Sequence, residues 1–193
     1  MARFPDVPAT TSDRVRLRRF TEADAPRVLD LHGRIEVVRW LDDPPFDLQV
    51  SRADAVRWID RAHTLQITDP RCGVWAVEVV ATGVVAGTAL LAPVPNDPRE
   101  RRQIGWHLHP DSVGHGYATE AAAAVRDHAF ACGLDEVLVL MYADNAPSAA
   151  VARRIGMTEL GVLPDPYYSG ESLFFTMTRD EHEALVGAAG PPP

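Results

Sequence analysis

One stretch in the second half of the chain constrains the fold more than any other. Residues 103–109 have the pattern of a strand, Gly114-His115-Gly116 follows, and an alanine-rich helix is predicted over 117–131. Two glycines in such a turn let the backbone take positive φ and approach a ligand without Cβ clashes. The order of strand, glycine turn and helix directs backbone N–H groups and a helix N-terminus at one point, which favours a phosphate-bearing ligand.

The remaining pattern predicts one α+β domain over 1–193, with flexible ends at 1–12 and 187–193. A capping-box signature, Thr21-Glu-Ala-Asp24, precedes one helix, and Ser51-Arg-Ala-Asp54 starts a second. Strands are expected at 14–20, 73–81, 83–91, 103–109, 136–142, 157–162 and 173–178, further helices at 117–131 and 146–155, and a last helical turn at 181–186.

Composition argues against several classes of function. The net charge of −8 argues against non-specific binding of nucleic acid. No lysine is present, so the chain has no residue for a catalytic Schiff base and no phosphate-loop lysine of the Walker type. No apolar run has membrane-spanning length and no signal peptide is evident, which predicts a cytoplasmic protein without a membrane partner. Cys72 and Cys132 lack metal-ligand spacing, and no metal is expected.

Downstream of the glycine turn come Asn145-Ala-Pro-Ser148 and Val151-Ala-Arg-Arg-Ile-Gly156. Together with the turn, these segments resemble the acyl-CoA-binding core of the GNAT superfamily of N-acetyltransferases, in the branch of the ribosomal-protein N-terminal acetyltransferases. The resemblance covers residues 14–180 and implies the GNAT fold, a mostly antiparallel sheet with helices on both faces. It also implies that the strands at 103–109 and 136–142 splay apart around acetyl-CoA, the co-substrate.

The resemblance places the pyrophosphate of coenzyme A on the glycine turn. The family pattern is Gln or Arg, two residues, Gly, one residue, then Gly or Ala, so Gly116 and Ala118 match and Val113 departs. A bulge in the strand at 103–109 would expose backbone N–H groups to the thioester carbonyl. The implied cofactor-binding residues are His107, Leu108, Val113, Gly114, His115, Gly116, Tyr117, Ala118, Thr119, Asn145 and Ser148.

Other interpretations of the turn compete with this one. Glycines also join strands to helices without binding a ligand, so the turn alone is a weak signal. A dinucleotide-binding turn is rejected, because Thr119 stands where the third glycine would be and the turn follows half of the chain. The alternative function is a non-catalytic acyl-CoA-binding module, which Val113 favours and which Asn145 and Ser148 oppose.

Acetylation of an amine needs a proton donor for the departing thiolate and an acceptor for the amine proton. The resemblance gives the first role to Ser148, whose hydroxyl is also typical of a helix cap beside Pro147. Glu171 falls near a carboxylate of the family branch and is the expected base, although positioning of the reactants can also supply much of the rate. The candidates for the proton acceptor are His107, Asp165, Glu171, Tyr167 and Tyr168.

The acceptor is expected over the loop at 41–47, where aromatic and acidic side chains gather. The aspartates there would attract a cationic amine, although aspartates before a Pro-Pro turn need no ligand. The resemblance implies an amine-bearing small molecule or a protein N-terminus as partner, and it is compatible with a homodimer. The expected substrate-binding residues are Trp40, Asp42, Phe46 and Tyr167.

Overall fold

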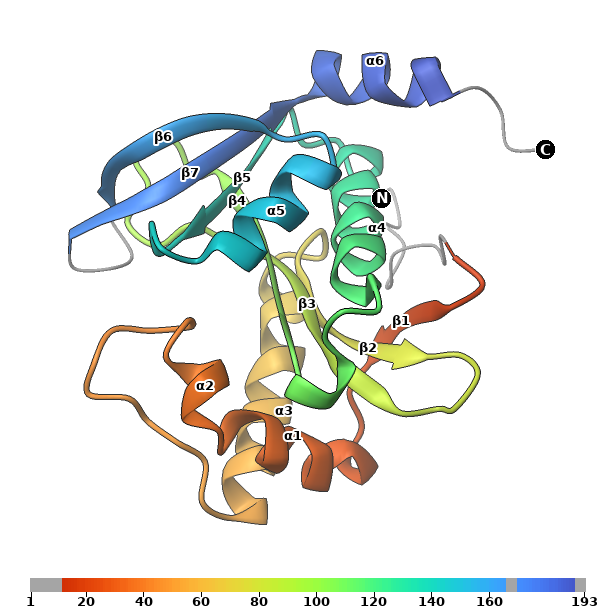
Figure 1. Cartoon of the computed structure of the whole chain (residues 1–193), viewed down its shortest axis with the longest axis vertical. Helices are drawn as coiled ribbons and strands as arrows, with labels where there is room; N and C mark the ends of the chain where they lie inside the picture. The colour runs from red at the N-terminus through yellow and green to blue at the C-terminus, as the bar shows by residue number, and fades with distance from the viewer. Residues whose placement is uncertain (1–11, 166–169, 190–193) are drawn as a thin grey trace.

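The computed structural model describes residues 12–165 and 170–189, and seven strands within these ranges form one sheet (Figure 1). The strands are β1 (Val15–Arg19), β2 (Gly73–Val79), β3 (Val85–Pro93), β4 (Arg102–Leu108), β5 (Glu136–Met141), β6 (Thr158–Asp165) and β7 (Gly170–Thr178). Their order in the sheet is β1-β2-β3-β4-β5-β7-β6, and every pair of neighbours is antiparallel except β4 and β5. The predicted mixed, mostly antiparallel sheet is therefore confirmed.

The parallel pair of β4 and β5 holds together at one end only. Arg102 lies opposite Val137 and Gln103 opposite Leu138, and these are the two matched positions between the strands. Beyond them β4 stays paired along β3 and β5 along β7, so the two halves of the sheet diverge (Figure 1). This divergence leaves one edge of each strand without a partner strand, inside the sheet.

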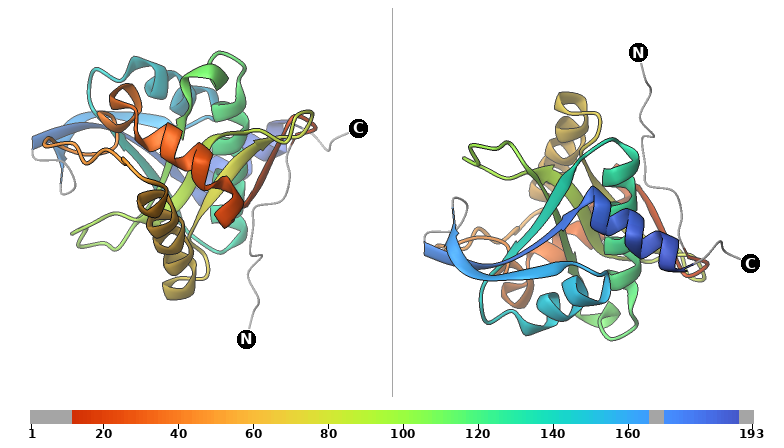
Figure 2. Two further views of the ribbon diagram at one scale, coloured as in Figure 1. Left: turned by 90° about the horizontal axis from the view of Figure 1, so that it is seen from below. Right: turned by 90° about the horizontal axis from the view of Figure 1, so that it is seen from above.

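Helices cover both faces of the sheet, as predicted. The helices α1 (Ala25–His32) and α3 (Arg52–Thr68) pack on one face, and α4 (Tyr117–Ala131) and α5 (Ala146–Arg154) on the other (Figure 2). Side chains alternate along β2, so that Trp75 joins the core under α4 and Ala76 joins the core under α1 and α3. Both residues have no exposed surface, because the sheet is covered on both sides at this point.

The helix α3 begins where the sequence pattern predicts. The Ser51 hydroxyl accepts a hydrogen bond from the Asp54 N–H at 3.3 Å, and the Asp54 carboxylate accepts one from the Ser51 N–H at 2.8 Å. These two bonds form a capping box at the predicted helix start. A short helix, α2 (Ile35–Val38), has no counterpart among the predicted elements.

The C-terminal helix α6 (Arg179–Ala189) is longer than the turn predicted at 181–186 and extends into the segment expected to be flexible. Its start is held by Thr178 and Glu181, because the Thr178 N–H donates to the Glu181 carboxylate at 2.8 Å. Threonine followed three residues later by glutamate is a capping signal, and it marks this helix start in the sequence as well.

Candidate active site

A cavity of about 1320 Å³ lies where β4 and β5 diverge. Its lining comes from α1, α2 and α3 on one side and from β4, the turn before α4, β5 and α5 on the other. This volume exceeds that of an ordinary site for a drug-sized molecule, so a long ligand fits the space. The predicted site residues that line it are Trp40, Asp42, His107, Leu108, Val113, Gly114, Gly116, Ala118, Thr119, Asn145 and Ser148.

The other predicted residues stand apart from the cavity lining. His115 and Tyr117 stack on each other with ring centroids 5.4 Å apart. Phe46 is half-buried in its loop, and Glu171 is exposed at the start of β7. Tyr167 lies outside the described residues. The structure thus brings most of the predicted cofactor-binding residues together but leaves the expected base, Glu171, away from them.

The open edge of β4 presents backbone donors to the cavity. The His109 N–H donates to the Ala86 carbonyl of the neighbouring chain segment at 2.8 Å. Because N–H groups alternate in direction along an antiparallel strand, those of Trp106 and Leu108 point away from β3 and into the gap. Pairing of β4 with β3 shows no register shift, so the expected bulge is absent and the splay of the strands exposes the donors instead.

The glycine turn has the backbone geometry that its sequence predicts. Gly114 and Gly116 both have a φ of +84°, and Gly116 is the N-cap of α4. A Cβ on Gly114 would meet nothing within 4 Å, so open space lies over the turn. The first N–H groups of any helix lack partners within the helix, and Ala118 and Thr119 in the first turn of α4 line the cavity. Val113 is 57% exposed, and its apolar side chain adds neither charge nor a hydrogen bond.

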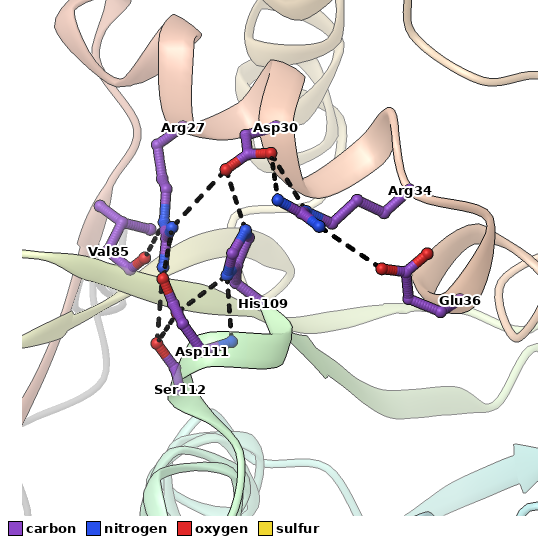
Figure 3. A network of polar contacts seen from close by, with 8 residues as sticks. All are labelled: Arg27, Asp30, Arg34, Glu36, Val85, His109, Asp111 and Ser112. Carbon is purple, nitrogen blue, oxygen red and sulfur yellow. Dashed lines mark hydrogen bonds and ion pairs between the residues drawn. The ribbon is translucent and has the colours of Figure 1, made fainter.

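A polar network fixes the segment before this turn to α1 (Figure 3). The imidazole of His109, only 6% exposed, lies 2.9 Å from a carboxylate oxygen of Asp30 and 2.8 Å from one of Asp111. Arg27 donates to Asp111 at 2.7 and 3.0 Å and to the Val85 carbonyl at 2.8 Å. The Arg27 guanidinium holds the pKa of Asp111 below its usual range. These contacts hold the segment just before the glycine turn against α1.

Asn145 and Ser148 open α5 with separate roles. Asn145 Oδ1 accepts a hydrogen bond from the Ser148 N–H at 3.2 Å, so Asn145 is the N-cap of the helix. The Ser148 hydroxyl does not serve as the cap, and within the described ranges it has no hydrogen-bond partner. Ser148 is one of the residues that line the cavity, so a hydroxyl without a protein partner lies next to the ligand space.

Two histidines meet at the cavity from opposite elements. His32 Nε2 on α1 lies 3.0 Å from His107 Nε2 on β4, and the His32 ring packs on Trp58 with centroids 4.5 Å apart. Burial lowers the pKa of His32 to about 4, and burial together with the nearby His32 lowers the pKa of His107. Both rings are therefore neutral at neutral pH, and one donates to the other. The sequence pattern predicted His107 but carried no signal for its partner.

Acidic side chains line the cavity beside the predicted acceptor loop. Glu36, Asp42 and Asp47 all contribute to the lining. The Tyr142 hydroxyl, which follows β5, donates to the Asp42 carbonyl at 2.8 Å and lies 2.9 Å from a carboxylate oxygen of Asp43. Burial and the neighbouring Asp43 raise the pKa of Tyr142, so its phenol stays protonated as a donor. This contact ties the loop to the end of β5.

Other kinds of site find no support in the part of the chain that the structure describes. No cluster of His, Cys, Asp or Glu side chains there is arranged to hold a metal ion. No helix in the same residues combines the length and apolar character needed to cross a membrane. Cys72 is a buried free thiol, and burial raises its pKa to about 12, so it is not a nucleophile at neutral pH.

The family of the chain is shown by its sequence, and the fold agrees with it. The sequence matches the family described as "Acetyltransferase (GNAT) domain" over residues 14–158. The chain therefore belongs to the GNAT acetyltransferases and is an N-acetyltransferase. The family predicted from the glycine turn and the Asn145–Ser148 segment is confirmed.

The similarity to other proteins extends over nearly the whole chain. "Uncharacterized N-acetyltransferase YoaA" of Bacillus subtilis (strain 168) is 25% identical over 170 residues, which cover 88% of this chain and 93% of that protein. An acetyltransferase of Agrobacterium tumefaciens str. C58 is 27% identical, with a TM-score of 0.69 over 89% of this chain and 93% of its own. RimJ of Mycobacterium smegmatis, solved with CoA-disulfide, has a TM-score of 0.73 at 22% identity, over 95% and 91% of the two chains.

Proposed function

We propose that this enzyme transfers the acetyl group of acetyl-CoA to a primary amine by direct attack. The gap between β4 and β5 carries the proposal, because it joins free backbone donors to a free hydroxyl in one cavity. The pantetheine arm would lie along the open edge of β4, and the pyrophosphate would lie at the N-terminus of α4. The solved complex of RimJ with CoA-disulfide, a protein of similar fold, supports coenzyme A as the ligand class.

The groups around the gap suit each step of acyl transfer. The amine nitrogen would attack the thioester carbon, and the negative charge that develops on the carbonyl oxygen would meet the N–H groups of Trp106 and Leu108. Collapse of the tetrahedral intermediate breaks the carbon–sulfur bond and releases the thiolate. The Ser148 hydroxyl would give this thiolate a proton and recover one from water. The products are the N-acetylated amine and coenzyme A.

For the proton that leaves the amine, we prefer His107 to Glu171. His107 lines the cavity and its lowered pKa keeps the imidazole neutral at physiological pH, whereas Glu171 is exposed and stands away from the lining. The contact of 3.0 Å with His32 would orient the His107 ring. A cationic amine would first lose one proton to water, because a protonated nitrogen has no lone pair for attack. His107 would then accept the second proton, which the nitrogen loses as the new carbon–nitrogen bond forms.

The acceptor we propose is a cationic amine, carried by a small molecule or by a protein N-terminus. Glu36, Asp42 and Asp47 line the cavity and would draw a positive charge toward it. The overall charge of −8 acts in the same direction at long range. Trp40 lines the same region and would pack against the apolar part of the acceptor.

Calorimetric titration with acetyl-CoA, coenzyme A and NAD tests the donor site, and release of the coenzyme A thiol in a screen of amines tests turnover. We expect binding of the CoA species, no response to NAD, and thiol release with at least one cationic amine. Binding without thiol release across the screen would instead favour the non-catalytic acyl-CoA-binding module. No binding of any CoA species would overturn the donor site.

A further inference from the structure

Val113 leaves the proposed pyrophosphate position without a cationic side chain from the turn itself. The pyrophosphate is anionic, and a guanidinium that meets it with paired N–H donors strengthens binding beyond what backbone N–H groups give. Val113 lines the cavity but is apolar. His115, the basic residue of the turn, stacks on Tyr117 and stands outside the cavity lining. A cationic side chain at this position would therefore come from another part of the chain.

Arg14, the residue before β1, reaches the turn. Figure 1 shows β1 beside the N-terminal end of α4, and the two elements are in contact. The Arg14 side chain lines the cavity, and its Nη2 atom lies 3.3 Å from the place where a Cβ on Gly116 would stand. The guanidinium carbon lies 5.9 Å from the centroid of the Tyr117 ring. Arg14 therefore stands at the helix end where the pyrophosphate is expected.

Glu120, in the first turn of α4, holds Arg14 there. Its Oε1 atom accepts a hydrogen bond from Arg14 Nη2, although the two residues are 106 positions apart in the chain. Its Oε2 atom is buried and has no partner among the described residues. A carboxylate alone at this point would repel phosphate, so the guanidinium neutralises it. Five N–H donors in one planar group allow contact with a carboxylate and a phosphate together.

We propose that Arg14 binds the pyrophosphate of coenzyme A in the place that Val113 leaves without a cation. This assignment rests on the proposed function, because it needs an acyl-CoA in the cavity. Arg61 on α3 and Arg154 on α5 also line the cavity, but the atoms within 4 Å of a Cβ on Gly116 belong to Arg14 and Glu120. Arg14 is thus the arginine placed at the turn.

Arg16, two residues further along the chain in β1, offers a matched control. Its side chain is 56% exposed, against 61% for Arg14, and it forms an ion pair with Glu78 as Arg14 does with Glu120. Arg16 is not among the residues that line the cavity. Arg14→Gln and Arg16→Gln therefore remove the same charge and a similar ion pair. Of the two, only Arg14→Gln changes a residue that lines the cavity.

The test is calorimetric titration of the full chain and these variants with coenzyme A and with dephospho-coenzyme A, which keeps the pyrophosphate. We expect Arg14→Gln to raise the Kd about tenfold for both ligands, the size of one charged contact, while Arg16→Gln stays within about twofold. The loss should persist in a Glu120→Gln background, which removes repulsion by the carboxylate that Arg14 no longer neutralises. Val113→Arg added to Arg14→Gln should recover most of the affinity.

Equal affinities of Arg14→Gln and Arg16→Gln would overturn the assignment and leave the proposed function standing. A loss seen with coenzyme A but not with dephospho-coenzyme A would place the contact on the 3′-phosphate, which also overturns it. If the unmodified chain bound neither ligand, both the proposed function and this assignment would be overturned. If Arg14→Gln does not fold, Arg14→Lys replaces it, with an expected loss of about threefold because lysine lacks the planar fork.

Discussion

Alanine at Gly114 tests whether the glycine turn is the phosphate site. Gly114 has a φ of +84°, and a Cβ there would meet nothing within 4 Å, so the protein itself has room for the methyl group. A non-glycine residue in this left-handed region costs about 1–2 kcal/mol. Loss of the glycine's freedom in the unfolded chain offsets about 0.4–1 kcal/mol of that cost. The expected net loss of stability is therefore about 1 kcal/mol.

Gly133 supplies the control, because it has a φ of +86°, follows α4 at its other end, and would also hold a Cβ in open space. The two alanine variants should unfold at the same temperature, about 2–4 °C below the parent for a chain of this size. Their affinities for coenzyme A should differ. A methyl group at Gly114 would occupy space against the ligand and raise the Kd about tenfold or more, whereas Gly133→Ala should leave it unchanged.

Thermal unfolding with and without coenzyme A, followed by titration calorimetry, measures both effects on the same samples. Ligand should raise the midpoint of Gly133→Ala as it does for the parent, and of Gly114→Ala much less. If Gly114→Ala and Gly133→Ala bound coenzyme A equally well, the turn would be only a connection between β4 and α4, and the placement of the pyrophosphate there would be refuted.

Further predictions concern the reacting groups. Ser148→Ala should lower kcat on the order of 100-fold with little change in the KM for acetyl-CoA; a raised KM at constant kcat would make Ser148 a binding residue only. His107→Gln should lower kcat by a similar factor while Glu171→Gln stays within about twofold, and the reverse ranking would restore Glu171 as the base. Asp42→Asn should raise the KM for a cationic acceptor about threefold at low salt and less at high salt; no change in an amine screen would exclude it from acceptor binding. Since the pKa of His32 falls from 6.5 to about 4 on folding, the unfolded chain binds more protons than the folded chain between these pH values. The free energy of unfolding should therefore decline as pH falls through that window, and it should decline less steeply in His32→Gln. Unfolding midpoints measured against pH for the two proteins test this.

Most elements of the fold could be predicted from local patterns, because their causes are local. Alternation marks the strands, and the capping box at Ser51 and Asp54 marks the start of α3. The positive φ of Gly114 and Gly116 follows from glycine itself in a strand-to-helix turn. The extent of α6 was missed although Thr178 and Glu181 carry a capping signal.

The sequence by itself determined the family, the glycine turn and the Asn145–Ser148 helix start, since each depends on residues close together in the chain. Only the tertiary structure brought His32 to His107, 75 positions away, and Arg14 to Glu120, 106 positions away. It also left Glu171 away from the cavity lining. Periodicity and capping act over a few residues, whereas these contacts depend on where α1 crosses the sheet and on how β1 passes α4. That packing is set by burial across the whole core and leaves no short-range signal in the chain.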